Sequence, residues 1–397
     1  MEKQSVKIVH DKVKVHSLTG RITEDLMLKA FKAVKKNRGA AGIDKVSIAM
    51  YESNLTENLL SLMKELKQGL YEPKPLRRVH IPKGDGKTRP LGIPPVKCRI
   101  AQEVLRRLIN PTFEGRFHDN SFGFRPGRNC HQAVERMLEL AQLGYRYVVD
   151  VDIKGFFDNI PHSLIMESLT AKIADGNILN TIERLLNSGV MEEGKIRPTT
   201  KGTPQGGVIS PLLANAVLDH LDWFLEDLKL HFVRYADDFV VLCKTRAEAE
   251  NALETIRNFL NSMNLEVSPE KTKVSTFSEG FNFLGFSIKN CSVKMKEKSK
   301  EKFKNAIRDI TTRSHNLDRK VIEKLNRVIR GVTNYFGAKF STMNYMFNNL
   351  DRWIRKRIRC MKYKRIWQSD NRRLKVTRIK KMGLLSCHEL YKARLRC

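Results

Sequence analysis

The segment RYADDFVVL, residues 234–242, places two adjacent carboxylates, Asp237 and Asp238, in a run that otherwise has the composition of a buried strand. The residues after the pair are aromatic, β-branched or aliphatic, which are the types that strands favour. A buried carboxylate without a partner is costly in free energy. The segment therefore predicts a strand whose two acids need a compensating group.

A second acidic segment, YRYVVDVDI at residues 145–153, has the same strand character. Side chains alternate between the faces of a strand, so Asp150 and Asp152 point to one face and Ile153 to the other. If the two segments are neighbours, their carboxylates converge, and unit charges about 4 Å apart repel by roughly 4 kcal/mol at an effective dielectric constant near 20. Either one carboxyl group is protonated or a divalent cation lies between them. Oxygen ligands suit Mg²⁺, and two such ions stabilise the attacking and leaving oxygens of a phosphoryl transfer.

The charge of the chain indicates a polyanionic partner. Its 397 residues include 73 Lys and Arg against 43 Asp and Glu, a net charge of +30. Such an excess opposes compaction by self-repulsion, and nucleic acid is the partner that best explains it. The sequence has no run of about 18 uncharged apolar residues and no signal peptide at its start, so we expect no membrane partner.

The seven cysteines are scattered and include no CxxC pair. This pattern argues against a disulfide framework and against a zinc site. A reducing, cytoplasmic location is the simplest expectation.

The order of the predicted elements indicates an α+β protein. Thr23 caps a helix near the start of the chain, and four apolar residues share one face of it: Met27, Ala30, Phe31 and Val34. Residues 77–94, RRVHIPKGDGKTRPLGIP, predict a strand, a glycine-rich turn and a second strand. Strands and helices alternate in the middle third, and a sheet covered by helices fits this order. From about residue 294 the sequence is helical and strongly basic.

The motifs together resemble those of the reverse transcriptases that group II introns encode, which are also maturases. Besides YADD and DIKGFFDNI, the chain contains, in the order of that family, HSLTGRITED, RGAAGID, RRVHIPKGDGKTRPLGIP, SFGFRPGRN, GTPQGGVISPLLAN, SPEKTKV and FNFLGF. The resemblance implies a right-hand polymerase with an α+β fold. It has an N-terminal extension and the start of the fingers in residues 1–75, fingers in 76–145, a palm with an antiparallel sheet in 146–293, and a helical, basic thumb or maturase (X) domain in 294–397.

The resemblance also implies roles at the catalytic centre. Asp152 and Asp237 match the principal ligands of two Mg²⁺ ions, for which Mn²⁺ is a substitute, and Asp238 is the accompanying acid. The backbone carbonyl of Ile153 completes the shell of the second ion. Lys271, in SPEKT, matches a lysine near the pyrophosphate, and a general-acid role follows because protonation helps the leaving group depart.

The triphosphate and the nascent base pair of an incoming dNTP have expected contacts in two motifs. Lys83 and Arg89 flank the GDGKT turn, where a point charge and a bidentate fork suit the phosphates. In GTPQGG, Gln205 can hydrogen-bond the base pair or the sugar, and Gly206 permits close approach of the backbone.

The sugar of the dNTP is expected to contact Phe157 and its neighbour Phe156. Phe157 follows Asp152 by five positions, where the resemblance implies an aromatic ring beneath the sugar that would clash with a 2′-hydroxyl. The alternative for Phe157 is a plain core position like that of Phe156.

Arginines and lysines in two regions are expected to contact nucleic acid. Arg125 and Arg128 of FGFRPGR suit the template backbone, with ordinary surface arginines as the alternative. In the C-terminal helices, cations alternate with aromatic residues, which favours RNA and DNA binding over a merely solvated face. The candidates there are Arg352, Arg355, Lys356, Arg359 and Lys362.

The resulting hypothesis is an RNA-directed DNA polymerase that extends a DNA primer on an RNA template with dNTPs. A maturase role is coupled to it, in which the basic surface binds intron RNA and assists group II intron splicing and retrohoming. Two alternatives stay open: a domesticated, defence-associated or DNA-repair reverse transcriptase without an intron, and an RNA-chaperone maturase without polymerase activity. No Cys-pair or His-rich cluster is present, so we expect no HNH endonuclease. The oligomeric state cannot be read from the sequence.

Overall fold

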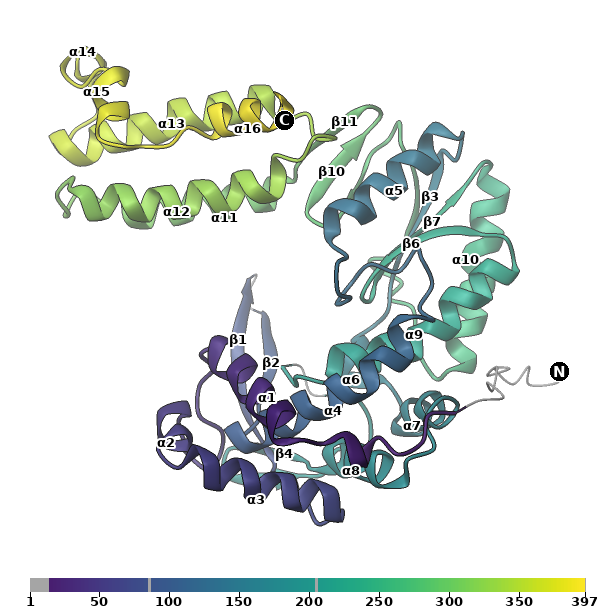
Figure 1. Cartoon of the computed structure of the whole chain (residues 1–397). Helices are drawn as coiled ribbons and strands as arrows, with labels where there is room; N and C mark the ends of the chain where they lie inside the picture. Colours follow the sequence, from purple (N-terminus) through teal and green to yellow (C-terminus); the bar gives the residue numbers. More distant parts are fainter. Residues whose placement is uncertain (1–13, 85–86, 204–205, 397) are drawn as a thin grey trace. The chain divides into compact units, whose positions relative to one another are not determined.

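The computed structural model describes residues 14–84, 87–203 and 206–396 (Figure 1). The chain forms two compact units, Met1–Val274 and Ser275–Cys397. The limit predicted between palm and thumb, after residue 293, lies inside the second unit, which therefore includes more than the helical C-terminal part. No helix in the described ranges is long and apolar enough to cross a membrane.

Three helices follow a short 3₁₀ turn, η1 (Thr19–Arg21), near the N-terminus. α1 (Glu24–Lys36) begins at Thr23, whose hydroxyl accepts a hydrogen bond from the Leu26 N–H at 3.3 Å. The buried face of α1 consists of Met27, Ala30, Phe31 and Val34, so the predicted cap and the predicted face are confirmed. α2 (Ile48–Glu52) and α3 (Leu55–Gln68) follow, and α3 packs against both α1 and α2.

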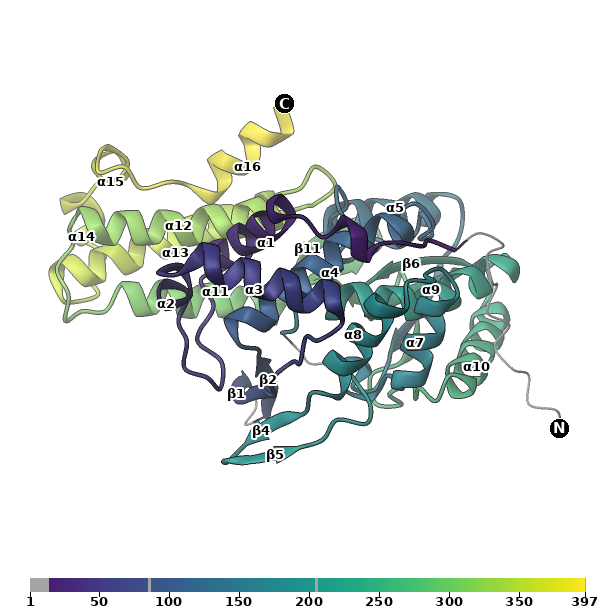
Figure 2. The same cartoon turned by 60° about the horizontal axis from the view of Figure 1, so that its bottom comes forward.

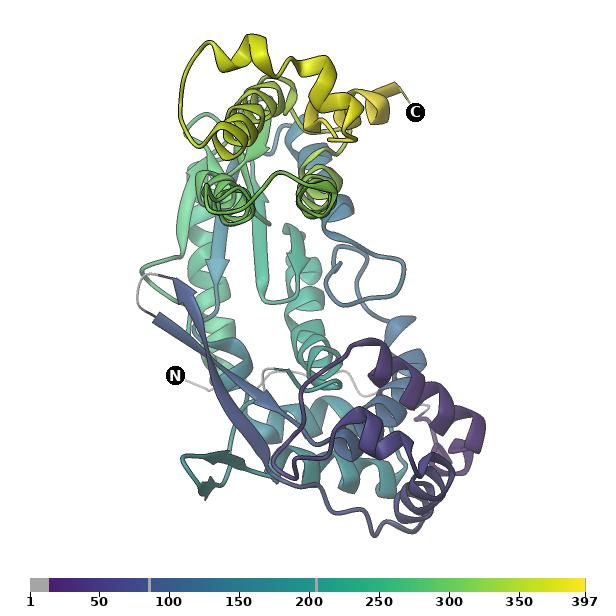
Figure 3. The ribbon, with the colours of Figure 1, turned by 90° about the vertical axis from the view of Figure 1, so that its left-hand side faces the viewer.

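A four-stranded sheet contains the predicted glycine-rich hairpin. β1 (Leu76–Gly84) and β2 (Lys87–Ile93) are antiparallel, with Ile81 opposite Arg89. β4 (Val190–Glu192) and β5 (Lys195–Arg197) extend the sheet in the order β2–β1–β4–β5, as Figure 2 shows. Figure 3 shows β1 and β2 as two long, twisted strands, as expected from the intrinsic twist of β-structure.

Two long helices lie in the core of the first unit. α4 (Val96–Glu114) and α9 (Ser210–Asp227) have buried residues on most of their circumference and contact each other. The polar side chains that α4 buries have partners. Gln102 accepts a hydrogen bond from the Val208 N–H at 2.7 Å, and Glu103 pairs with Arg106 and Arg107. Burial of these polar groups is tolerated because each is hydrogen-bonded.

A second sheet, of order β6–β7–β3–β8, carries the acidic segments. Its strands are β3 (Tyr147–Asp152), β6 (His231–Tyr235), β7 (Asp238–Cys243) and β8 (Lys273–Thr276). The predicted single strand through RYADDFVVL is wrong, because the chain reverses at Ala236 and Asp237 and forms a hairpin of β6 and β7. The hairpin buries the apolar residues of both strands and leaves the carboxylates at the edge of the sheet.

Helices pack on this sheet, which confirms the α+β class. α5 (Cys130–Gln142) contacts β6 and β7, and α10 (Arg246–Ser262) contacts β3 and β7. The remaining helices of the unit are α6 (Phe156–Asn159), α7 (His162–Thr170) and α8 (Gly176–Asn187).

The second unit combines a small sheet with helices. β9 (Phe281–Phe283), β10 (Phe286–Lys289) and β11 (Ser292–Met295) form an antiparallel sheet of order β11–β10–β9. The helices are α11 (Glu297–Ile310), α12 (Arg319–Phe336), α13 (Asn344–Tyr363), α14 (Asp370–Arg373), α15 (Val376–Lys381) and α16 (Cys387–Arg396). α11 packs against α12, and α16 packs against both α12 and α13.

A buried ion pair joins α9 to the β6–β7 hairpin. Arg234 of β6 and Asp222 of α9 are both fully buried, and Arg234 Nε donates to Asp222 Oδ1 at 2.6 Å. The second terminal nitrogen of Arg234, Nη2, donates to Asp222 Oδ2. Nη1 donates to Asn215 Oδ1 and to the carbonyl of Ala236, both at 3.0 Å. A buried guanidinium is tolerated only when its charge and its donors are satisfied, and this cluster meets both conditions.

Replacement of Asp222 by alanine is expected to lower the free energy of unfolding by about 3–5 kcal/mol, because the buried Arg234 charge then has no counter-ion. The measurement is the free energy of unfolding, obtained by urea titration of the wild type, of Asp222→Ala and of a control variant. The control is Asp227→Ala, which removes an exposed carboxylate from the same helix and should change stability by about 0.5 kcal/mol or less. Equal losses in the two variants would contradict the role of the ion pair.

Candidate active site

The second sheet brings the predicted acids together. β3 and β7 are antiparallel neighbours, and Asp152 at the end of β3 lies directly opposite Asp238 at the start of β7. Asp237 lies next to Asp238, in the turn between β6 and β7. Asp150 is two residues further inside the sheet, opposite Val240. One edge of the sheet therefore gathers carboxylates from two distant segments of the chain.

The turn that carries Asp237 is conformationally constrained. Ala236 has a φ of 60°, in the left-handed region that residues other than glycine adopt uncommonly. Arg234 donates a hydrogen bond to the Ala236 carbonyl, and Gly123 lies so close that a Cβ at Gly123 would overlap the Ala236 nitrogen. Such strain persists where the surrounding structure imposes it. The backbone position of Asp237 is thus set by its neighbours in the fold.

The electrostatics of the site disfavour ionised carboxylates. Burial raises the pKa of Asp237, and the negative charge of Asp152 raises it further, whereas Arg89 and Arg234 act in the opposite direction. Burial also raises the pKa of Asp150 to about 6, with Lys273 lowering it and Asp152 raising it. An added cation would favour the charged forms of both groups.

The segment that contains Lys271 closes around the end of β3. The Ser268 N–H donates to the Asp152 carbonyl at 2.8 Å, and the Asp152 N–H donates to the Thr272 hydroxyl at 3.2 Å. Lys271 Nζ donates to both carboxylate oxygens of Asp152, at 3.1 Å and 2.9 Å. The predicted general acid and the predicted metal ligand are therefore in direct contact.

The arrangement fits a divalent cation. The Asp152 carboxylate already attracts one positive group, the Lys271 ammonium. Two backbone hydrogen bonds flank Ile153: the Asp152 carbonyl accepts one, and the Lys154 N–H donates the other. The Ile153 carbonyl takes part in neither of these two bonds. Among the described residues, no three or more His, Cys, Asp or Glu side chains form a group that could hold a metal by themselves. The chain would thus supply a few oxygen ligands and leave other positions to water and phosphate, as Mg²⁺ sites commonly do.

The two phenylalanines expected at the sugar have different environments. Phe156 is 1% exposed and belongs to the core, so the dNTP contact predicted for it does not fit its burial. Phe157 is only partly buried, and its ring lies 5.6 Å from that of Phe156. Of the two rings, Phe157 is the one that a nucleotide can reach.

The residues expected at the triphosphate are only partly described. Arg89 is exposed on β2 and close enough to lower the pKa of Asp237. Gly206, with a φ of 104°, lies against β2, where a Cβ would stand 2.8 Å from the Gly92 carbonyl oxygen, so no other residue fits without a shift. The Lys83 side chain and Gln205 lie outside the described residues.

Arg125 and Arg128 both bind residues of the segment that precedes them. Arg125 is 8% exposed, and its guanidinium binds the Glu114 carboxylate and the carbonyls of His118 and Ser121. Arg128 binds the Asp119 carboxylate at 2.6 Å and the Asp119 carbonyl. The template contact predicted for Arg125 does not fit its burial, whereas the side chain of Arg128 is 25% exposed and its template contact stays a prediction. The hydrogen bonds and ion pairs of the two arginines fix the loop that carries Gly123 against the Ala236 turn.

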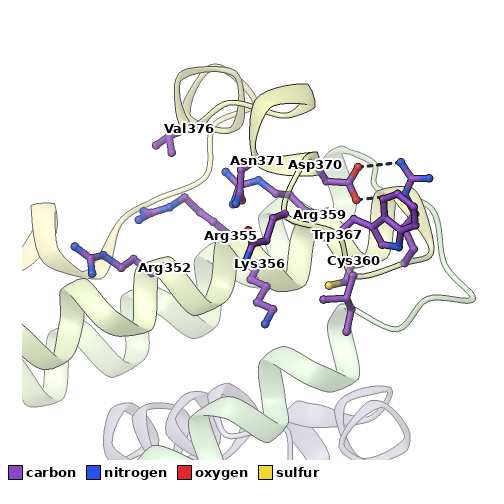
Figure 4. A pocket seen from close by; sticks show the side chains of 12 residues that line it. Arg352, Arg355, Lys356, Arg359, Cys360, Trp367, Asp370, Asn371 and Val376 are labelled. Atoms are coloured by element: carbon purple, nitrogen blue, oxygen red, sulfur yellow. Dashed lines mark hydrogen bonds and ion pairs between the residues drawn. The ribbon is translucent and has the colours of Figure 1, made fainter.

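The other predicted nucleic-acid contacts lie in the second unit. Four of the five α13 residues line one pocket, shown in Figure 4: Arg352, Arg355, Lys356 and Arg359. Lys362 is exposed, and its ammonium lies 5.7 Å from the centre of the Tyr363 ring.

The sequence prediction missed the residues that position the acidic turn. Arg234, Asp222 and Asn215 carry this role, and Asn215 Nδ2 also donates to the Gly123 carbonyl at 2.8 Å. Two signals were present. An arginine interrupts the apolar strand FVRY, and Asn215 and Asp222 are seven residues apart, which places them on one face of a helix.

Comparison with known proteins agrees with the motifs. Residues 81–288, more than half of the chain, match the family model "Reverse transcriptase (RNA-dependent DNA polymerase)", and residues 300–380 match "Group II intron, maturase-specific domain". Protein YkfC of Escherichia coli (strain K12) is 33% identical over 318 residues, which cover 70% of this chain and 84% of YkfC.

Two further proteins are similar. Group II intron-encoded protein LtrA of Lactococcus lactis subsp. cremoris is 28% identical over 428 residues, covering 81% of this chain and 70% of LtrA. A chain of the solved partial Cas6-RT-Cas1--Cas2 complex covers 62% of this chain and 42% of its own length, with 23% identity and a TM-score of 0.40, too low to bear on function. The two family models and the identity with YkfC are sufficient: the chain belongs to the reverse transcriptase family, within the group II intron-encoded reverse transcriptases that carry a maturase domain.

Proposed function

We propose that this RNA-directed DNA polymerase extends the 3′-hydroxyl of a DNA primer at the edge of the β6–β7–β3–β8 sheet, with dNTPs as substrates and RNA as the template. The observation that carries the proposal is the pairing of β3 with β7, which puts Asp152 opposite Asp238 and within electrostatic reach of Asp237. Acids at this edge are otherwise unfavourable, because burial and mutual repulsion raise the pKa of Asp237.

The carboxylates of Asp152 and Asp237 are the proposed ligands of two Mg²⁺ ions, with Mn²⁺ as a substitute, and Asp238 and the Ile153 carbonyl complete the set. When bound, the ions would supply the positive charge that stabilises the attacking and leaving oxygens of phosphoryl transfer. Lys271 is the proposed proton donor to the leaving pyrophosphate. Its ammonium is 2.9 Å from Asp152 Oδ2, and 59% of its side chain is exposed to solvent.

The residues proposed to contact the dNTP hold it in place for the reaction. Arg89 is proposed to bind the triphosphate, together with Lys83, and Gly206 and Gln205 to lie at the nascent base pair. Phe157 is proposed to exclude a 2′-hydroxyl. Phe157 is the second residue of α6, whose N-cap is Gly155. The Thr203 N–H donates to the Phe157 carbonyl at 2.7 Å and fixes its backbone.

The maturase role belongs to the second unit. Its match to the maturase-specific model over residues 300–380 and the cations of α13 favour binding of group II intron RNA in splicing and retrohoming. We place the protein in the cytoplasm, where a reducing environment suits the six free cysteines of the described chain. A domesticated reverse transcriptase, separated from any intron, uses the same active site and differs only in its RNA partner.

Asp237→Asn is expected to reduce primer extension on an RNA template by at least about 10²-fold, because it removes a charged ligand from the site of developing charge. Thermal stability should be retained or rise, since the substitution removes a buried negative charge beside Asp152. Steady-state incorporation of radiolabelled dNTP measures the rate, and Asp227→Asn, an exposed acid on α9, is the control. Undiminished synthesis by Asp237→Asn would refute the assignment.

Phe157→Val is expected to lower the ratio of kcat/KM for dNTP to that for rNTP by about 10–100-fold, the range available to a steric contact of this size. Single-nucleotide extension with each substrate gives the ratio. Phe156→Leu is the matched control, since this ring is in the core and its loss should affect stability but not the ratio. An unchanged ratio in Phe157→Val, or the same change in both variants, would exclude Phe157 as the sugar contact.

A further inference from the structure

A pocket of about 640 Å³ lies in the second unit between α13 and the segment that follows it. α13 contributes Arg352, Arg355 and Arg359 to its lining, and the following segment contributes Trp367, Gln368 and Asn371. Figure 4 shows Asn371 beside Arg355 and Arg359, and Trp367 at the end of the row of α13 side chains that is away from Arg352. The volume is within the range of sites that enclose a small molecule or a single group of a larger one.

The α13 wall of the pocket is strongly positive. Arg352, Arg355 and Arg359 recur at intervals of three and four residues, which places them on one helix face, away from the buried Ile354 and Ile358. Like charges at this spacing destabilise a helix. Burial lowers the pKa of Arg359, and the charge of Arg355 lowers it further. This face therefore favours a bound anion.

The negative charge in the lining is already neutralised. Asp370 is 1% exposed, and its Oδ1 lies 3.2 Å from the Arg365 guanidinium. Within the described part of the second unit, the head groups of Arg352 and Arg355 have neither an ion-pair partner nor a hydrogen-bond acceptor. Arg359 uses Nε to bind the Leu374 carbonyl at 3.0 Å and keeps its other donors. The pocket thus has free donors for at least two phosphate groups.

The segment after α13 adds an aromatic ring to the lining of the pocket. Trp367 is 65% exposed, although contact of a large apolar side chain with water is unfavourable in free energy. The Arg365 guanidinium lies 4.9 Å from the centre of the indole, and the ion pair of Arg365 with Asp370 fixes that guanidinium in turn. An exposed ring that is held in place provides a surface on which a nucleobase can stack.

Two amide side chains complete the recognition elements. Gln368 and Asn371 line the pocket and are exposed. Each amide has both donors and an acceptor, and such groups form paired hydrogen bonds with base edges. A purely electrostatic phosphate site would need neither the indole nor these amides.

We propose that this pocket binds one unpaired nucleotide of an RNA loop or bulge, and the inference rests on the proposed RNA-binding role of the second unit. The base stacks on Trp367, its edge meets Gln368 and Asn371, and Arg352 and Arg355 bind the flanking phosphates. Paired bases are stacked inside a helix and cannot enter a pocket, whereas unpaired bases of loops and bulges can be extruded and read by stacking. The pocket therefore gives the unit a preference for folded RNA that exposes a single base.

The test uses the full-length protein and two RNA hairpins of equal length, whose strands are joined by a non-nucleotide linker instead of a loop. One hairpin is fully paired and the other has a single-nucleotide bulge, in four base versions. Fluorescence anisotropy gives Kd at fixed salt. The wild type should bind the best bulged hairpin about tenfold more tightly than the paired one. Trp367→Leu should reduce this difference to less than about twofold. Tyr345→Leu, which changes an exposed aromatic residue of α13 (77% exposed) outside the pocket lining, should keep it.

The charged wall has its own control. The double variant Arg352→Gln and Arg355→Gln should lose the preference for the bulge, whereas Arg327→Gln with Arg330→Gln on α12 changes the net charge equally and should keep it. Full preference in Trp367→Leu, or none in the wild type, would overturn the inference. The inference would also fail if adenosine monophosphate, followed by the quenching of Trp367 fluorescence, bound with the same Kd as the bulged RNA. The ligand would then be a free nucleotide.

The outcomes also separate this inference from the proposed function. If the wild type neither extends a primer nor binds either hairpin, the proposed function fails. If it extends primers and binds the paired hairpin without preferring the bulge, only the inference about the pocket fails.

Discussion

The buried guanidinium of Arg234 is the interaction on which the active-site geometry depends. It neutralises Asp222, binds Asn215 and donates to the carbonyl of Ala236, so it connects α9 with the hairpin that carries Asp237. Its charge is fully enclosed, and each of these partners offsets part of the free-energy cost of burying it. The SFGFRPGRN loop also holds β6 in place, since the Phe122 N–H donates to the Arg234 carbonyl at 2.8 Å. Arg125 fixes that loop through its ion pair with Glu114. The acids proposed for catalysis and the structural charges are therefore arranged in layers, with the structural layer buried and internally neutral.

The acids at the edge of the sheet, Asp152 and Asp237, differ from this buried layer because their negative charge is not balanced within the site. Burial and the charge of Asp152 disfavour the ionised form of Asp237, whereas Arg89 and Arg234 favour it. Lys271 pairs with Asp152. A site that holds repelling acids at a sheet edge is suited to a divalent cation and a phosphate substrate. The same principle recurs in the second unit, where Arg352, Arg355 and Arg359 repel each other on one helix face. In both places the chain keeps charges of the kind that nucleic acid or its metal ions would neutralise.

Local patterns in the sequence were sufficient for much of the fold. The cap at Thr23, the buried face of α1 and the glycine-rich hairpin follow from periodicity and turn chemistry, and the alternation of Asp150 and Asp152 follows from strand geometry. The reversal at Ala236 was missed because hairpin turns usually contain Gly or Asn at a left-handed position, and here an alanine is forced into it. Phe156 and Phe157 are chemically identical neighbours, so only tertiary packing distinguishes the core ring from the accessible one. Arg125 and Arg128 were assigned to the template because their motif suits such a contact, and no local pattern reveals that Arg125 pairs with Glu114, 11 residues earlier.

The central claim is that Asp152 and Asp237 hold divalent cations together. Its most direct test is the anomalous diffraction of crystals grown with Mn²⁺. We predict anomalous peaks within about 2.5 Å of carboxylate oxygens from both residues, with Lys271 displaced from Asp152. The contradicting result is a site without Mn²⁺ at saturating concentration, in which Lys271 keeps its salt bridge to Asp152.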